Sequence, residues 1–483
     1  MFKKKINHYL KLKTKDILKK FGLKIEKITN LETQLLKVNN IKNNNVKIKT
    51  IKSLIKRFPN SPKLHLYLIK CLHEEGDSEK FDHFEIFNKK RQQNIEDLGL
   101  SSLNLEFIWS GMVAGSLGNH YPLESLINAA NLGLRKKKQL TILLSKKLNL
   151  RNNHFLKYFN EHINLIRDED TINSLRAFAN FLELPLGICI PLDSSCPSLD
   201  AASNITQSLK IKNNDNKPLF KLTDEDLEKG YNILHSIGVP KDAWYVTLHA
   251  RELGYRGENL NNSSEDFRNT DLNTYNEAAN FITNSGGWVF RMGDSSMKDI
   301  NTNNKNLIDY ANSKIKSEFM DVFLGATSKF CIGSSSGYYH IPFTFSVPVL
   351  FTNSPRFEEY YGLRKNDLYL PRMITKKNEK KPINLNFFTD TPQGIYNNKQ
   401  SYLKDDLEYI PNSSEEIYAS TVEIFKSIEK NNINNVNKKQ GDFLKLARAK
   451  SDQYYKEFLK ECEDSIFLEP IRLHIRKISE KNI

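Results

Sequence analysis

The 483-residue chain has few cysteines and no long apolar run, and each shortage excludes a class of protein. Its five cysteines are odd in number and scattered, without a Cys-x-x-Cys pair or a Cys/His metal spacing, which argues against a disulfide framework or a zinc module. No apolar run approaches the roughly 20 residues that cross a bilayer, and the N-terminus lacks a signal-peptide core. We therefore expect a cytoplasmic protein, soluble or peripheral at the inner membrane face.

Acidic residues are also in deficit, because 57 Asp and Glu stand against 71 Lys and Arg, a formal net charge of +14. This excess favours an acidic partner such as a nucleotide, a phosphate group or an anionic membrane. No nucleic-acid-binding signature accompanies it, so nucleic acid is not a predicted partner. The lysine-rich residues 1–28 have two interpretations: a helix resting on an anionic membrane, or a helix packing its apolar stripe on the next domain.

The chain is too long for one ordinary core, and its patterns divide it into four parts. Residues 1–95 are predicted to be helical, with about one and a half tetratricopeptide-like helix pairs. Residues 96–235 begin as strand, glycine loop, helix and strand, and the Ser/Asn-rich stretch at 190–221 predicts an exposed connection or lid. Residues 236–440 form a second α/β domain, and residues 441–483 predict a C-terminal helix.

The second α/β domain alternates strands and helices with unusual regularity. Strands are predicted at 244–248, 288–291, 329–332 and 347–351, and helical segments at 272–284, 305–312, 318–326 and from about 337. This order predicts a doubly wound parallel sheet. Ligands of such sheets bind beyond the carboxyl ends of the strands.

Polar clusters follow three of these strands, at the edge where a ligand is expected. They are His249 with Arg251, the run Arg291-Met292-Gly293-Asp294, and the turn Gly333-Ser334-Ser335-Ser336-Gly337. An arginine here can make a two-pronged contact with phosphate, and the serine turn can hold a diphosphate without a metal. The structural alternatives are a core histidine, a buried Arg291–Asp294 ion pair and a serine helix cap. Arg268 and Asn269 are weaker candidates.

Two further patterns have both a functional and a structural interpretation. The loop carrying Gly115, Gly118, Asn119 and His120 suits an anion or a sugar hydroxyl near a helix N-terminus, or simply a tight strand-to-helix turn. The Asp-Glu-Asp triplets at 168–170 and 224–226 superficially match an Asp-x-Asp metal motif. Both stand at predicted helix starts, where capping is the favoured role, and no metal site is predicted.

The segments TLHARELGY, FRNTDLNTY, GGWVFRMGDSSM and IDYANSKIKSEFMDVFLGATSKFCIGSSSGYYHIPFTFSVPVLFTN together resemble a family of bacterial glycosyltransferases of cell-surface carbohydrate synthesis. More distantly they are similar to fucosyltransferases of the GT-B fold. The resemblance implies two Rossmann-like domains facing a cleft, with a nucleotide sugar bound by the second and a glycan or lipid-linked acceptor by the first. It also implies donor-diphosphate contacts from His249, Arg251 and Ser334 to Ser336. After Arg251 the sequence departs from the family's His-x-Arg-x-Gly-Asp pattern.

The leading hypothesis is therefore sugar transfer from a nucleotide diphosphate to a hydroxyl acceptor, without a metal or other cofactor. Arg251 and the amides of residues 333–337 would neutralise the departing diphosphate, with Arg291 as a second phosphate contact. Glu252, Asp294 and His249 are the candidate bases, and the sequence does not choose among them. The alternatives are a non-catalytic nucleotide- or glycan-binding protein that docks partners through its N-terminal helices, and a membrane or nucleic-acid binder predicted from charge alone.

Overall fold

The computed structural model describes residues 31–429, with gaps, and the two-residue strand β13 (Arg472–Leu473). The gaps within the first range are 32, 76, 78, 98, 102–103, 109, 111–112, 114–116, 149, 185, 187–188, 194, 198, 214, 216, 253–265, 301, 355–363, 365 and 380–398. The predicted N-terminal helix at 1–28, and the predicted C-terminal helix apart from β13, lie outside the described residues. No helix in the described part of the chain combines the length and apolar character that a membrane crossing requires.

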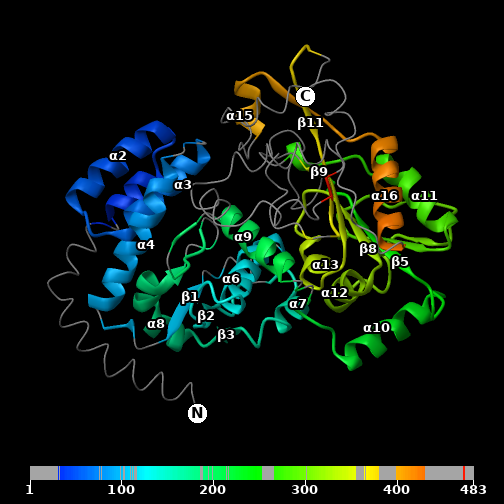
Figure 1. Ribbon diagram of the computed structural model, residues 1–483, viewed down its shortest axis with the longest axis horizontal. Helices are drawn as coiled ribbons and strands as arrows, with labels where there is room; N and C mark the ends of the chain where they lie inside the picture. The colour runs from blue at the N-terminus through cyan, green and yellow to red at the C-terminus, as the bar shows by residue number, and fades with distance from the viewer. Residues whose placement is uncertain are drawn as a thin grey trace. The chain divides into compact units, whose positions relative to one another are not determined.

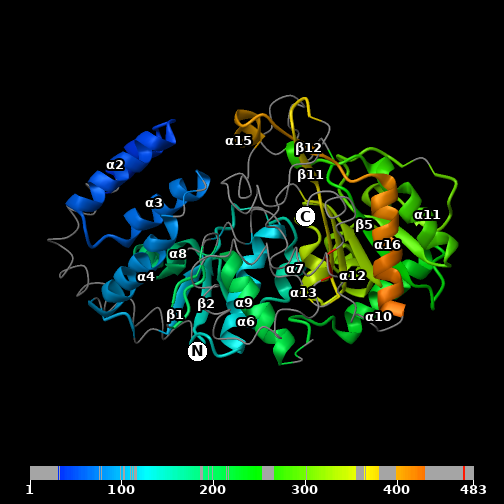
Figure 2. The ribbon, with the colours of Figure 1, turned by 45° about the horizontal axis from the view of Figure 1, so that its top comes forward.

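The first part of the chain is helical, as the sequence predicts, and contains α2 (Asn44–Arg57), α3 (Pro62–Glu74) and α4 (Lys80–Asp97). The side chain of Asn43 caps α2 by accepting from the amide of Val46, and Pro62 opens α3, where its missing N–H costs nothing. Figures 1 and 2 show these helices lying beside one another.

Two compact units make up the chain, and each contains one main parallel sheet. Unit 1 comprises residues 1–114, 133–149 and 160–199, and unit 2 comprises residues 115–132, 150–159 and 200–483. The predicted domain boundaries after residues 95, 235 and 440 stay predictions.

The sheet of unit 1 has the strand order β3-β2-β1-β4, all parallel. Its strands are β1 (Leu105–Ile108), β2 (Gln139–Leu143), β3 (Ile163–Ile166) and β4 (Glu183–Leu184), and α8 (Glu169–Leu182) connects the last two. The buried carboxylate of Glu106 is neutralised by Arg135, with Arg91 and Lys138 each 3.6 Å away. A buried carboxylate needs such partners because it has lost its hydration.

The sheet of unit 2 has the order β13-β10-β9-β8-β5-β6-β7, and all its strand pairs are parallel. Its other strands are β5 (Tyr245–His249), β6 (Trp288–Arg291), β7 (Leu307–Ile308), β8 (Phe330–Gly333), β9 (Val349–Ser354) and β10 (Leu368–Pro371). The chain runs from β5 outward through β6 and β7, then returns to β8 on the other side of β5. This confirms the predicted doubly wound sheet and makes β5/β8 its topological switch point.

Helices cover both faces of this sheet, which is why all five residues of β5 are buried. The helices α11 (Asn276–Asn284) and α16 (Ser414–Glu429) lie side by side against one face and share its apolar core (Figures 1 and 2). The helices α12 (Glu318–Thr327) and α13 (His340–Thr344) lie on the other face, and α10 (Asp224–Ser236) packs on α12. The sheet is therefore enclosed by helices on both faces, and a turn follows the end of each strand.

The remaining elements of unit 2 are short helices and a two-stranded ribbon. They comprise η2 (Leu117–His120), α6 (Tyr121–Asn131), α7 (Asn153–Lys157), α9 (Leu199–Lys212), η3 (Asp266–Arg268), η4 (Leu272–Tyr275), η5 (Tyr310–Asn312), α15 (Lys399–Lys404), and antiparallel β11 (Met373–Lys376) with β12 (Leu407–Ile410).

Two local predictions are wrong. Residues 190–221 contain the helix α9 rather than only an exposed connection, because Ala202, Ile205 and Thr206 form a buried face at helical spacing. The stretch 305–312 forms β7 and the single turn η5 rather than a longer helix-like segment. There β7 pairs with β6, and this edge-strand pairing overrides a weak local helical preference.

Candidate functional site

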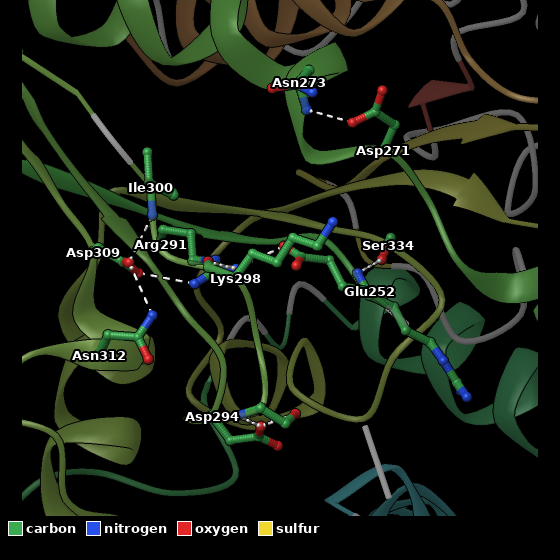
Figure 3. Close-up of polar contacts among 12 residues, drawn as sticks. Glu252, Asp271, Asn273, Arg291, Asp294, Lys298, Ile300, Asp309, Asn312 and Ser334 are labelled. Atoms are coloured by element: carbon green, nitrogen blue, oxygen red, sulfur yellow. Dashed lines mark hydrogen bonds and ion pairs between the residues drawn. The ribbon is translucent and has the colours of Figure 1, made fainter. Parts of the chain in front are cut away.

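The ends of β5 and β8 meet at the switch point and are joined by hydrogen bonds. His249 lies opposite Gly333 in the register of the two strands. The amide of Ser334 donates to the carbonyl of His249 at 3.0 Å, and the amide of Arg251 donates to Oγ of Ser334 at 2.8 Å (Figure 3). The structure thus brings together the His-x-Arg element and the serine turn, which lie more than 80 residues apart in the sequence.

The serine turn contacts the imidazole ring of His249. Oγ of Ser336 lies 3.4 Å from Nε2 of His249, and the ring of Tyr338 stacks on the imidazole with centroids 5.5 Å apart. Burial lowers the pKa of His249 from 6.5 to about 4, so this ring is neutral at pH 7. His249 can therefore contribute a neutral ring nitrogen to an anionic ligand but not a cationic contact. Its Nδ1 has no hydrogen-bond partner in the described part of the chain.

Three arginines from different segments gather around these strand ends. Nε of Arg251 donates to Oδ1 of Asn269 at 3.2 Å. Arg268 donates through Nε and Nη2 to the carbonyl of Ser335, at 3.1 and 2.9 Å. Arg372, directly after β10, donates through Nη1 to the carbonyl of Phe267 at 2.7 Å and through Nη2 to that of Asn269. The acceptors of these bonds are backbone carbonyl oxygens and the side-chain amide oxygen of Asn269.

Arg291 has a different environment from these three. Its guanidinium is 1% exposed and donates to Oδ1 of Asp309 at 2.9 Å and to Oε1 of Glu252 at 2.7 Å (Figure 3). A third bond reaches the carbonyl of Lys298 at 3.1 Å. The predicted ion pair between Arg291 and Asp294 is therefore wrong, because Arg291 pairs with Asp309 and Glu252 instead. Arg291 instead joins the ends of β5 and β6 to the segment that follows β7.

Two of the three candidate bases thus have their carboxylates engaged in hydrogen bonds within the protein. The Glu252 carboxylate pairs with buried Arg291. Asp294 folds back on its own turn and accepts from the amide of Ser296 at 2.9 Å and from the hydroxyl of the same residue (Figure 3). Of the three, His249 is the one that contacts the serine turn.

The predicted acceptor loop packs within unit 2. Gly115 lies outside the described residues, and Gly118 and Asn119 are part of η2. His120 is 1% exposed, its Nδ1 lies 2.9 Å from the carbonyl of Leu117, and its ring packs against two phenylalanines, Phe155 and Phe159. Such burial is typical of a packing role, so we do not include His120 among the ligand contacts below.

His340 and Arg372 are residues at this edge that the sequence pattern passes over. Burial, together with the charges of His120 and Arg268, lowers the pKa of His340 from 6.5 to about 3. In the sequence, neither residue belongs to one of the three polar clusters that follow the strands. Only the structure shows the long-range contacts of Arg372 and the burial of His340. A basic residue directly after a strand was the one available signal for Arg372.

The two acidic triplets lie at the starts of α8 and α10, as predicted, and each start has a side-chain cap. Oδ2 of Asp168 accepts from the amide of Thr171 at 2.9 Å, and the hydroxyl of Thr223 accepts from the amide of Asp226 at 3.1 Å. Within the described residues, no group of three or more His, Cys, Asp or Glu side chains is arranged to hold a metal ion. Metal independence itself stays a prediction.

No family model matches this chain, and no curated protein matches it. Among solved structures, UDP-GlcNAc 2-epimerase from Methanocaldococcus jannaschii is similar over 71% of this chain and 82% of that chain, at 13% sequence identity and a TM-score of 0.22. A likeness at this score supports no inference about the site, so the two parallel sheets and the strand-end geometry remain the direct observations.

Proposed function

We propose that unit 2 binds the diphosphate of a nucleotide sugar at the β5/β8 switch point and that the chain transfers the sugar to a hydroxyl acceptor. The observation that carries this proposal is the junction of Arg251 with the Ser334–Ser336 turn at that position. Open parallel sheets bind their ligands at such a switch point. The positive net charge and the resemblance to bacterial surface-carbohydrate glycosyltransferases support the same reaction class.

In this proposal the cationic side chains stabilise the charge that develops as the sugar–phosphate bond breaks. The backbone amide of Arg251 and the side chain of Arg268 both donate to the serine turn, and a guanidinium can hold two phosphate oxygens at once. The electron pair of the broken bond stays on the departing diphosphate, and its charge is met by fixed donors. Neutral His249 is the base we retain, because a diphosphate bound beside the ring would raise its pKa toward neutrality.

Removal of the Arg251 guanidinium tests this site. We expect Arg251→Ala to weaken binding of nucleoside diphosphates by roughly 10- to 100-fold, since a charged hydrogen bond contributes about 1.5–3 kcal/mol. Calorimetry with a panel of nucleoside diphosphates measures the loss. Lys241→Ala is the matched control, because it removes the same charge from an exposed position just before β5. Equal affinities in the two variants would remove Arg251 from the site.

Transfer itself needs a separate measurement. We expect release of nucleoside diphosphate from a nucleotide sugar in the presence of a hydroxyl acceptor, at an unchanged rate in EDTA. Activity that EDTA abolishes and manganese restores would contradict the metal-independent mechanism.

A non-catalytic nucleotide-binding role is the second candidate. The observation that favours it is that Glu252 and Asp294, two of the three candidate bases, are held in structural contacts. Tight binding of nucleotide sugars without hydrolysis or transfer to any acceptor would support this alternative.

A further inference from the structure

Arg372 lies directly after β10 and connects the end of that strand to the segment 266–270. Its side chain is buried, with 7% exposure, and its amide donates to the carbonyl of Ser354 at 2.9 Å. Its guanidinium donates to the carbonyls of Phe267, at 2.7 Å, and Asn269. Two nitrogens of one planar group thus fix two carbonyls of the same short segment, which the single ammonium of a lysine cannot reproduce.

The segment 266–270 in turn contacts both strand ends of the candidate site. Asn269 accepts from Nε of Arg251 at 3.2 Å, and the amide of Thr270 donates to the carbonyl of Arg251 at 2.9 Å. Arg268, from the same segment, donates to the carbonyl of Ser335 at 2.9 Å. The contacts of Arg372 therefore reach Arg251 and the serine turn through one intermediate segment.

We infer that Arg372 is a positioning residue for a pyrophosphate site, because it holds the segment that fixes the Arg251 side chain through Asn269 and carries Arg268 to the serine turn. The inference deepens the proposed function and rests on its site, while requiring only that the site bind pyrophosphate. Donors that are fixed before the ligand arrives lose little conformational freedom on binding, so their contacts contribute more to affinity. Without Arg372 the segment 266–270 loses two anchors, and the contacts of Arg251 with Asn269 and of Arg268 with Ser335 lose their support.

Arg364 provides a matched control within unit 2. It also donates to two backbone carbonyls, those of Phe343 at 2.8 Å and Val347 at 2.6 Å, and it pairs with Asp367. These contacts lie before β9 and β10 begin, at the opposite edge of the sheet from the serine turn. Arg364→Ala therefore removes similar chemistry without affecting the segment 266–270.

The experiment measures the affinity of the full chain for inorganic pyrophosphate by calorimetry. We expect Arg372→Ala and Arg372→Lys each to weaken binding by roughly 10-fold or more, and Arg364→Ala to leave it within about 2-fold of the unmodified chain. We also expect the combined Arg251→Ala/Arg372→Ala variant to bind scarcely less well than Arg251→Ala alone, because the two residues act on the same contact. The lysine variant keeps the charge and serves as the test if the alanine variant does not fold.

Each outcome decides the inference. Pyrophosphate affinities of the Arg372 variants equal to that of Arg364→Ala would overturn it, as would losses that multiply in the double variant. Absence of pyrophosphate binding by the unmodified chain would also overturn it. Pyrophosphate binding that depends on Arg372, in a chain that transfers no sugar, would overturn only the proposed function.

Discussion

At the scale of single residues, burial decides whether a charged group binds a ligand or holds the protein together. Arg291 is almost fully buried, and a guanidinium in that position requires the carboxylates of Glu252 and Asp309 beside it. Arg251 and Arg268, by contrast, are partly exposed: Nε of Arg251 donates to Oδ1 of Asn269, and Arg268 donates to the carbonyl of Ser335. We therefore propose a structural role for Arg291 and a ligand-binding role for Arg251 and Arg268.

The role of Glu252 can be tested by stability as well as by activity. Glu252→Gln keeps the size of the side chain but removes the charge that faces buried Arg291, so we expect unfolding to become easier by roughly 1–3 kcal/mol. Urea unfolding measures this, with Asp294→Asn as the comparison, because the hydrogen bonds of the Asp294 carboxylate are to Ser296 of its own turn rather than to a buried cation. A Glu252→Gln chain of unchanged stability that has lost all transfer would instead identify Glu252 as the base.

Glu124 in α6 predicts a dependence of stability on pH. Burial raises the pKa of Glu124 from 4.5 to about 7, partly offset by the charges of Arg364 and Lys210, while Asp367 adds to the rise. A raised carboxyl pKa means that the folded chain holds a proton that the unfolded chain releases. The stability from this group is therefore complete below pH 4.5 and is lost as pH rises to about 7.

Glu124→Gln should remove that dependence. We expect the variant to gain stability over the unmodified chain between pH 5 and pH 8, by on the order of 3 kcal/mol at most. Urea unfolding of both chains at the two pH values gives the difference directly, and other titrating groups cancel in the comparison. A difference between the chains that does not change with pH would contradict the raised pKa of Glu124.

At the scale of elements, the packing of α10 on α12 depends on a glycine. A Cβ atom placed on Gly230 would lie 2.1 Å from the ring of Phe323, whose side chain is fully buried. The ring contacts Tyr231 edge-on at 5.3 Å between centroids, which limits its movement. The two helices can therefore approach this closely only because residue 230 is a glycine and has no side chain.

Gly230→Ala accordingly has two opposing effects on stability: a higher helix propensity, and a steric overlap between the added methyl group and the ring of Phe323. Alanine favours a helix interior by about 1 kcal/mol, while overpacking costs typically 1–3 kcal/mol or more. We expect net destabilisation and a lower melting temperature, measured by circular dichroism. Glu228→Ala, at an exposed position of the same helix, should leave stability unchanged or slightly raised. A more stable Gly230→Ala chain would show that α10 can move away from α12.

At the scale of the whole molecule, the net charge of +14 acts on any anionic ligand before contact. Long-range attraction raises the association rate and is screened by salt, with a Debye length of about 10 Å at 0.1 M. In the proposed function, Arg251 and Arg268 then provide the short-range contacts. Rate and affinity should therefore respond differently to ionic strength and to substitution.

Stopped-flow binding can separate the two contributions. We expect the association rate constant of a fluorescent nucleoside diphosphate to fall severalfold between 20 mM and 300 mM salt, while that of an uncharged nucleoside changes little. Arg251→Ala should act mainly on the dissociation rate, as loss of a direct contact does. An association rate that does not respond to salt would exclude steering by the net charge.

Local patterns were sufficient for most of the second sheet, because consecutive buried residues and helix caps are encoded within short windows. The strand at 288–291 and the capped helix from Asp224 lie where the sequence predicts them. The same short stretches of sequence give wrong predictions for α9 and β7, because the formation of these elements depends on the surfaces that they contact. They also treat Cys189 and Cys196 as scattered, although the buried sulfurs of these residues lie 3.5 Å apart.

What the sequence alone determined about this protein is therefore the class of sheet and the residue types present at the carboxyl edge of its strands. These properties follow from periodicity and from strand direction, which are local. Only the tertiary structure decided that Arg251 meets Ser334, that Arg291 pairs with Glu252 and Asp309, and that Arg372 holds the segment 266–270. Such pairings join residues 18 to 105 positions apart, and no spacing along the chain encodes which distant group a buried charge will find.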